Sequence, residues 1–220
     1  MKNILCYGDS NTWGNIAGSM NLELRLAKRY EYGVRWTSVL QQILGNNFHI
    51  IEVGLNGRTT ALDEKIIARP SRNGLAMLPG IIEMHYPLDL VIFMLGTNDL
   101  KIEFNVTLEK ITQNMRQLIH YIKNSHFGNN YGIPQVMLIS PAPILQVDVP
   151  AFNLFYDDAS INKSTQLAKH YENLAKEEHC AFLDAGLFVK IDHSDGVHIA
   201  RDSHSDLARA IAQVIKDMRL

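Results

Sequence analysis

The sequence predicts an α/β fold, a three-layer α/β/α sandwich around a five-stranded parallel sheet. Two observations indicate it. Five short apolar runs rich in branched residues recur along the chain, and amphipathic segments separate them. Strands that alternate with helices form a parallel sheet that is covered on both faces. The 220 residues, 46% of them hydrophobic, suit a single domain over residues 1–220.

The strands are expected at the apolar runs, about Asn3 to Tyr7, His49 to Val53, Asp89 to Leu95, Gln135 to Ser140 and Ala181 to Asp184. The third run has no polar residue between Leu90 and Leu95, which indicates the central strand. Helices are expected where apolar residues recur at spacings of three and four, over Leu108 to Ile122, Leu167 to Ala175 and Leu207 to Met218. Ser203 and Asp206 have the spacing of an approximate capping pair before the last helix.

Two segments show no regular pattern, Ile16 to Val34 and Leu62 to Pro79. Loops of this length in a compact domain are usually functional or mobile. Because they follow the first two predicted strands, they are candidates for walls of a substrate pocket or for partner contacts. Solvated loops without a role are the equal alternative.

Composition excludes several classes of function. The formal net charge is −2 and no Lys/Arg run occurs, so nucleic acid is not an expected partner. No apolar run approaches the roughly 18 residues that span a bilayer, and the N-terminus lacks a secretory signal, so no membrane association is expected. Cys6 and Cys180 are expected to be buried free thiols in a reducing compartment, which predicts a cytoplasmic location.

A polar turn follows the first predicted strand and carries Gly8-Asp9-Ser10. In open α/β sheets, ligands bind in the crevice outside the carboxyl ends of the strands, so the Ser10 hydroxyl is expected there. The turn by itself leaves two interpretations open. Ser10 is a nucleophile, or it supplies a helix-capping oxygen together with its polar neighbours.

Of nine histidines, His198 has the most informative context. It ends the run Asp195-Gly196-Val197-His198 between the last predicted strand and the last predicted helix. An aspartate three residues before a histidine can bend back to accept its Nδ1 proton, which directs Nε2 toward a nucleophile. His193 and His204 lie close by in sequence and are expected to have surface or capping roles.

Two further strand ends offer donors for an oxyanion. Gly57 follows the second strand and can direct a backbone N–H into the crevice, and Asn98 follows the third strand and can donate from its side-chain amide. Asn-Gly is also a common turn dipeptide, and Gly96-Thr97-Asn98-Asp99 can simply cap a helix. The coincidence of these features at four strand ends on one edge favours a catalytic site.

These blocks resemble the SGNH hydrolases, also called the GDSL esterase and lipase family, over nearly the whole chain. The blocks are Gly8-Asp9-Ser10, Gly57, Gly96-x-Asn98-Asp99 and Asp195-x-x-His198. The wider runs Tyr7 to Gly14, Val34 to Thr37, Gly54 to Thr60 and Met94 to Asp99 are most similar to the bacterial arylesterase and acyltransferase branch.

The resemblance implies a flavodoxin-like fold in which Ser10 is the nucleophile, His198 the base and Asp195 its orienter. It implies an oxyanion hole from the Ser10 and Gly57 N–H groups and Asn98, with no metal and no cofactor. It also implies a homo-oligomer whose neighbouring subunits narrow the active-site entrance. The expected substrate-pocket residues are Asp9, Asn11, Trp13, Thr97 and Val197.

The chain departs from the family pattern beside its catalytic residues. Asn11 stands where the family usually has an apolar residue, and Val197 and Ile199 flank His198 with a different bulk. These departures concern substrate preference. The stretch Pro141 to Asp158 is a candidate interface. Five aromatic residues are candidates for pocket walls, subunit contacts or plain core: Trp13, Trp36, Phe152, Phe155 and Tyr156.

The expected activity is that of a serine esterase that hydrolyses small-acyl carboxylic esters through an acyl-enzyme and can transfer the acyl group to alcohols. A carbohydrate O-acetylesterase or an acyl thioesterase could use the same residues. A catalytically silent binding module is a further alternative. A flavin or nucleotide carrier is disfavoured, because no glycine-rich phosphate loop follows the first strand.

Overall fold

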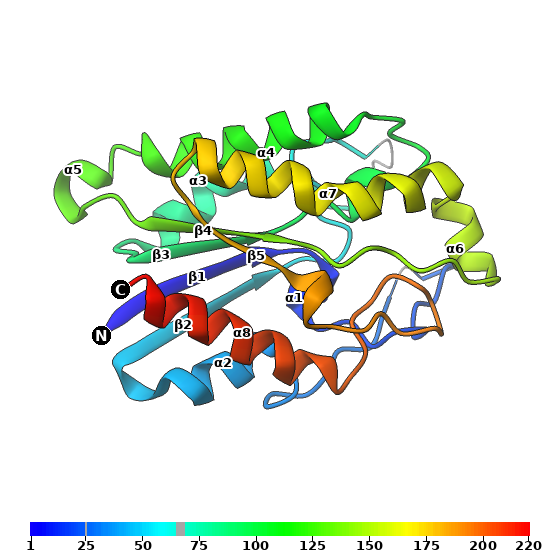
Figure 1. The fold of residues 1–220 in the computed structure, drawn as a ribbon, viewed down its shortest axis with the longest axis horizontal. Coiled ribbons are helices and arrows are strands. Elements are labelled where there is room, and N and C mark those ends of the chain that lie inside the picture. The colour runs from blue at the N-terminus through cyan, green and yellow to red at the C-terminus, as the bar shows by residue number, and fades with distance from the viewer. Residues whose placement is uncertain (25, 65–68) are drawn as a thin grey trace.

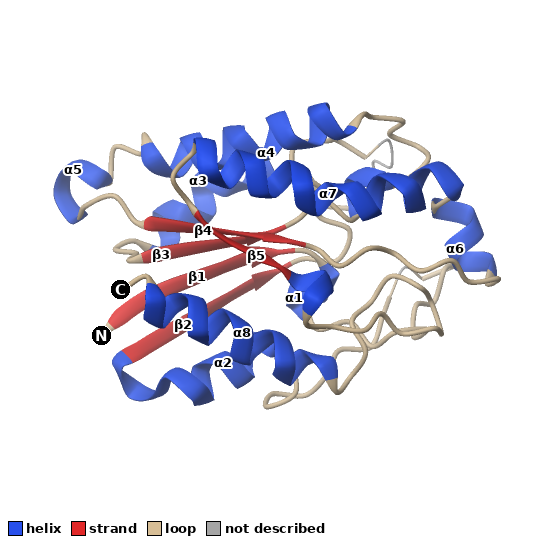
Figure 2. Ribbon diagram, viewed as in Figure 1, coloured by secondary structure: helices blue, strands red, loops and turns tan. Residues whose placement is uncertain are grey.

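The computed structural model describes residues 1–24, 26–64 and 69–220, and it contains a parallel sheet between two layers of helices (Figures 1 and 2). The five strands are β1 (Lys2–Gly8), β2 (Phe48–Gly54), β3 (Leu90–Met94), β4 (Gln135–Ser140) and β5 (Ala181–Asp184). Each agrees with a predicted run to within one residue at either end. The strand order is β2-β1-β3-β4-β5, which confirms the predicted central strand and the α/β/α architecture.

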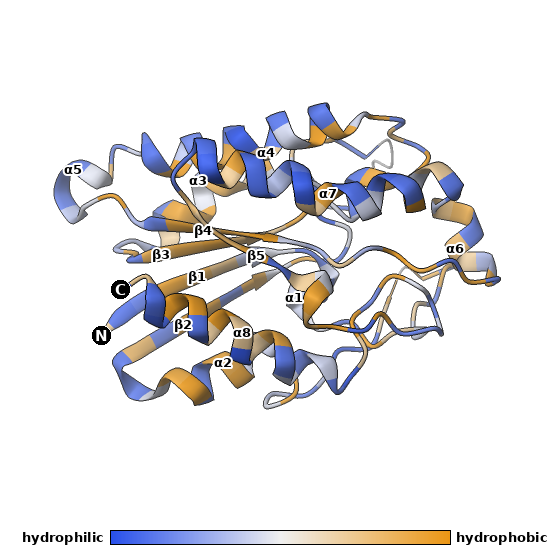
Figure 3. Cartoon of the chain, viewed as in Figure 1, coloured by the Kyte–Doolittle hydropathy of each residue, from blue (hydrophilic) through white to orange (hydrophobic). Residues whose placement is uncertain are grey.

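Helices cover the two faces of the sheet unequally (Figure 1). One face carries α3 (Gly74–His85), α4 (Leu108–Lys123) and α7 (Asp158–Glu177), and the other carries α2 (Trp36–Leu44) and α8 (Ser203–Asp217). Alternate side chains of each strand enter separate cores because successive residues point to opposite faces. Leu5 packs into the first core and Ile4 into the second. Figure 3 shows the apolar strands between helices whose outer sides are polar.

Short elements complete the chain. They are α1 (Ser10–Trp13), α5 (Gly128–Tyr131), α6 (Pro150–Phe155) and the 3₁₀ turns Gly45–Asn47, Asn98–Leu100 and Ala185–Leu187. The carboxyl ends of the strands, with α1 and α6, point to the right of Figure 1, opposite to both chain termini. The crevice in which the sequence places its polar blocks therefore lies at that edge.

Two expectations about helices are corrected. The predicted irregular segment Leu62 to Pro79 is helical from Gly74 onward, because the Asn73 side chain accepts the Ala76 N–H and caps α3 in spite of Pro79. The predicted capping pair of the last helix is wrong. Ser203 is already the first helical residue, and its hydroxyl accepts the Lys190 N–H instead. The three predicted helices are α4, α7 and α8.

Both cysteines are free thiols, but only Cys6 is fully buried. Cys180 is partly exposed, which corrects the expectation that both are buried, because it lies in the turn before β5 rather than within the sheet. Burial raises the pKa of the Cys180 thiol to about 11 and that of Cys6 well above its ordinary value. None of the helices in the described part of the chain combines the length and apolar character that crossing a membrane requires.

Candidate active site

Ser10 is the first residue of α1, directly after β1. The Asp9 side chain caps this helix by accepting the Asn11 N–H at 2.9 Å, and Gly14 ends it in the left-handed conformation. The Ser10 side chain is therefore held at the carboxyl end of the sheet with 8% of its surface exposed. The capping oxygen of this turn comes from Asp9, so the Ser10 hydroxyl does not serve as the cap.

The structure brings Ser10, His198 and Asp195 into one chain of hydrogen bonds. His198 Nε2 lies 2.9 Å from Ser10 Oγ, and His198 Nδ1 lies 2.7 Å from Asp195 Oδ2. Asp195 Oδ1 accepts the backbone N–H groups of Val197 and His198, each at 3.0 Å. Gly18 N–H donates to Asp195 Oδ2 at 2.8 Å, so the irregular segment Ile16 to Val34 contacts the site through Gly18. Residue 25 of this segment lies outside the described structure.

Asp195 remains ionised throughout the neutral range. Burial raises the pKa of this carboxyl, but the hydrogen bond and charge of His198 and the two backbone N–H donors outweigh burial. The net pKa lies well below its usual range. An ionised Asp195 fixes the His198 tautomer and stabilises the imidazolium that forms when Nε2 accepts a proton.

The three residues that the sequence offers as candidate oxyanion donors lie after the ends of three strands. Gly57 has φ +83°, a left-handed backbone that favours glycine. The Ser10 and Gly57 N–H groups donate to no acceptor within the described residues. Asn98 Nδ2 donates to the Arg58 carbonyl at 3.1 Å and lies 3.4 Å from Asp9 Oδ2. The second distance is long for a hydrogen bond, so the amide hydrogen on that side is only weakly engaged by Asp9.

Sequence reasoning missed a buried layer beneath these donors. The Arg58 guanidinium donates to the carbonyls of Gly8 and Val53 and lies 4.0 Å from the ring centroid of Tyr7. It therefore ties together the ends of β1 and β2. Arg58 directly follows the predicted site residue Gly57 in the sequence. This adjacency is the feature of the sequence that could have indicated its place near the site.

Asp99 forms a second part of this layer, where it accepts both the backbone N–H and the hydroxyl of Thr60. Burial raises the pKa of Asp99 to about 7 and that of Asp9 to about 6, in both cases against the effect of hydrogen bonds. The carboxyl groups at the base of the site therefore hold protons more tightly than exposed aspartates.

The five predicted pocket residues fall into two groups. Asp9, Asn11 and Thr97 are buried. The Asp9 side chain accepts the Asn11 N–H, and the Asn11 side chain bonds to the backbone of residues 197 and 199. Trp13 and Val197 are partly exposed. Arg29 lies over the Trp13 ring, 5.2 Å from its centroid.

The candidate aromatic residues are mostly core. Trp36, Phe152 and Tyr156 are buried in the two hydrophobic clusters, and Trp13 and Phe155 are partly buried. Among the competing histidines, His193 is exposed, as expected. His204 has the expected capping role, since its Nδ1 lies 3.3 Å from the Trp36 N–H at the start of α2. It is buried rather than at the surface, and burial lowers its pKa to about 4.

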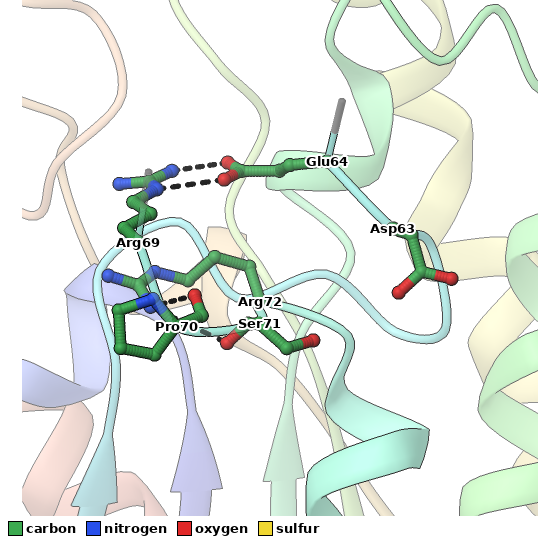
Figure 4. A pocket seen from close by; sticks show the side chains of 6 residues that line it. All are labelled: Asp63, Glu64, Arg69, Pro70, Ser71 and Arg72. Atoms are coloured by element: carbon green, nitrogen blue, oxygen red, sulfur yellow. Dashed lines mark hydrogen bonds and ion pairs between the residues drawn. The ribbon is translucent and has the colours of Figure 1, made fainter. Parts of the chain in front are cut away.

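A charged wall stands next to Gly57 (Figure 4). The pocket in this figure is lined by Asp63, Glu64, Arg69, Pro70, Ser71 and Arg72. Arg69 forms an ion pair with Glu64, and its Nη2 lies 3.0 Å from where a Cβ on Gly57 would stand. Arg72 donates to the Asn56 carbonyl at 2.8 Å. Part of the segment Leu62 to Pro79 thus adjoins the site, while its residues 65–68 lie outside the described structure.

Comparison with known proteins decides the family. Residues 6–211 match the GDSL-like lipase/acylhydrolase family. The chain belongs to this family. No sequence among the curated proteins matches the chain.

Several solved structures resemble this GDSL-like acylhydrolase over its whole length. A carbohydrate acetylesterase family member from Sinorhizobium meliloti is 35% identical, with 99% of each chain covered and a TM-score of 0.91. The aryl esterase of M. smegmatis is 37% identical, with 99% of each chain covered and a TM-score of 0.90. A lipase/acylhydrolase from Enterococcus faecalis shares the fold at 20% identity and a TM-score of 0.64, with 99% and 97% covered. Family and neighbours together make the protein an esterase of the acylhydrolase class.

The described residues of this GDSL-like acylhydrolase contain no group of three His, Cys, Asp or Glu side chains placed to hold a metal ion.

Proposed function

We propose that this acylhydrolase is a serine esterase that cleaves small-acyl carboxylic esters through an acyl-enzyme. The observation that carries the proposal is the continuous chain of contacts from Ser10 Oγ through His198 to Asp195, at 2.9 and 2.7 Å. A serine is a weak nucleophile until a base within hydrogen-bond reach takes its proton. His198 lies within that reach, and the ionised Asp195 orients it.

The proposed reaction has two halves. Ser10 Oγ attacks the ester carbonyl carbon while His198 Nε2 takes the hydroxyl proton, and the carbonyl oxygen becomes an oxyanion. The Ser10 and Gly57 N–H groups and Asn98 stabilise that charge. The tetrahedral intermediate then collapses, and His198 gives its proton to the departing alcohol. Water repeats the sequence on the acyl-enzyme and releases the carboxylic acid. An alcohol in place of water would receive the acyl group.

The test is initial-rate hydrolysis of p-nitrophenyl esters from acetate to octanoate at neutral pH. We expect rates that fall with acyl-chain length, and a loss on the order of 10⁶ in kcat for Ser10→Ala. The matched control is Ser205→Ala on α8, where the lost hydroxyl donates to the Asp202 carbonyl and accepts from Arg209 of the same helix. Equal rates for the wild type and Ser10→Ala on every ester would contradict the proposal.

A carbohydrate O-acetylesterase is the second candidate. The charged wall next to Gly57 favours it, because guanidinium and carboxylate groups bind sugar hydroxyls better than an aryl ring. A similar protein from S. meliloti is also named a carbohydrate acetylesterase family member. Measuring kcat/KM on acetylated sugars, aryl acetates and acyl thioesters separates the two esterase candidates and also tests the thioesterase alternative. A higher value on acetylated sugars would assign the protein to that class.

We also propose that the protein acts in the cytoplasm as a homo-oligomer. Exposed leucines near the catalytic edge support association, with Leu24 and Leu26 each 63% exposed on the loop after α1 and Leu154 61% exposed on α6. α6 lies within the predicted interface Pro141 to Asp158. Sedimentation velocity of the wild type should show a species larger than one chain, and the double variant Leu24→Lys/Leu154→Lys should shift it toward the monomer. A monomeric wild type at micromolar concentration would contradict the proposal.

A further inference from the structure

The Asn11 side chain lies beside the backbone on which His198 stands. Asn11 is buried, with 6% of its surface exposed, and it directly follows Ser10 on α1. Its Oδ1 accepts the Ile199 N–H at 2.9 Å, and its Nδ2 lies 3.3 Å from the Val197 carbonyl. One amide therefore binds the residue on either side of His198.

The backbone groups of His198 itself bond elsewhere. Its N–H donates to Asp195 Oδ1 at 3.0 Å, and its carbonyl accepts the Asp192 N–H at 2.9 Å. The His198 backbone is thus held through its own groups by Asp195 and Asp192, and through the groups of its two neighbours by Asn11.

We propose that Asn11 is a positioning residue that sets His198 against Ser10. The nucleophile and the amide that grips the His198 loop occupy adjacent positions of one short helix. Any movement of α1 therefore carries the loop with it and preserves the 2.9 Å contact between Ser10 and His198. The inference rests on the proposed serine-esterase mechanism.

Removing the amide has a specific cost at this place. Ile199 is 2% exposed, so its N–H would lose its partner away from water. The loop would shift to satisfy that group. Because a misplacement of about 1 Å can lower turnover by about 10²-fold, we expect the loss mainly in kcat.

The chain contains a matched control for the same kind of bond. Gln41 of α2 brackets His49 on β2: its Oε1 accepts the Ile50 N–H at 2.8 Å, and its Nε2 donates to the Phe48 carbonyl at 3.0 Å. These bonds lie at the amino end of β2, the sheet edge opposite to Ser10. Gln41→Met removes the same pair of amide contacts, together with a bond from Nε2 to the Gly45 carbonyl at 3.1 Å, without touching the catalytic edge.

The experiment compares Asn11→Leu and Gln41→Met with the wild type in kcat, KM and Tm on p-nitrophenyl acetate. We expect Asn11→Leu to lower kcat by about 10- to 100-fold with KM within about threefold. Gln41→Met should lower Tm and leave kcat within about twofold. Equal kcat values in Asn11→Leu and Gln41→Met would overturn the positioning role.

Asn11→Asp keeps the side-chain volume and serves if the leucine variant fails to fold. It retains an acceptor for the Ile199 N–H, but it sets a carboxylate oxygen against the Val197 carbonyl and adds negative charge near His198. We expect an intermediate kcat and an acid limb of the kcat/KM profile that moves to higher pH, because the added charge stabilises the imidazolium. An unmoved acid limb with wild-type kcat would also overturn the role. Absence of any Ser10-dependent turnover in the wild type would instead refute the esterase mechanism itself.

Discussion

Asp9 joins the helix of Ser10, the proposed nucleophile, to Asn98, a proposed oxyanion donor. One carboxylate oxygen caps the helix that begins at Ser10, and the other lies 3.4 Å from the Asn98 amide. Asn98 is held independently by the Arg58 carbonyl. The donor is therefore fixed before substrate arrives, and pre-organised donors of this kind contribute most when charge develops in the transition state.

Asn98→Ala should lower kcat by about 10² to 10³, because one oxyanion donor is lost while the Ser10 and Gly57 N–H groups remain. Turnover should stay measurable. The measurement is kcat on p-nitrophenyl acetate, with Asn114→Ala on α4 as the control, since Asn114 is a buried asparagine outside the catalytic edge. Unchanged turnover in Asn98→Ala would remove Asn98 from the oxyanion hole.

The helix α1 sits directly on the end of β2. A Cβ on Gly54 would fall 2.1 Å from the Trp13 backbone nitrogen and 2.5 Å from its Cα. Because the obstructing atoms are backbone, α1 would have to move as a unit, and Ser10 would move with it. Gly54 thus allows the contact between two elements that places the nucleophile.

Gly54→Ala should lower kcat at least tenfold and reduce the free energy of unfolding, because α1 is displaced. Gly80→Ala is the matched control: Gly80 is exposed in α3 with no atom within 4 Å of its added Cβ, so the substitution should stabilise by about 0.5–1 kcal/mol. Kinetics and urea unfolding of both variants check this. Wild-type kcat in Gly54→Ala would show that turnover does not depend on the contact between α1 and the end of β2.

The strands could be predicted from the sequence because their branched apolar runs are continuous, and α4, α7 and α8 because their apolar stripes are long. The helix α3 escaped prediction because Pro79 lies within it, and α2 because it is short. Ser10, Gly57, Asn98 and His198 could be placed at one edge because each follows a strand or precedes a helix. The bonds of Arg58, Gly18 and Asn11 depend on segments brought together only by the fold, so no local pattern contained them.

Two buried carboxyls make the stability of the molecule depend on pH. The pKa values of Asp9 and Asp99 are raised to about 6 and about 7, above the value near 4 of an unfolded chain. Between about pH 4 and 7 the folded state therefore binds more protons than the unfolded state. Stability contributed by these groups is fully present below about pH 4 and falls as pH rises through 6 to 7.

Asp99→Asn should remove part of this dependence, because an amide accepts the Thr60 N–H without carrying a buried charge. We expect the free energy of unfolding of the wild type to fall relative to that of Asp99→Asn between about pH 4 and 7, by up to a few kcal/mol. Urea unfolding across this range measures the difference, and exposed Asp206→Asn on α8 is the control. Parallel curves for the wild type and Asp99→Asn would contradict the raised pKa.

The contact between Ser10 and His198 joins residues 188 positions apart. Synthesis proceeds at about 5–20 residues per second, so β1 and Ser10 leave the ribosome early. Nearly the whole chain must then be made before His198 follows. A nascent chain can form most of its sheet and still lack the base that is proposed to activate Ser10. On the proposed mechanism, Ser10-dependent esterase activity begins only after residue 198 has emerged.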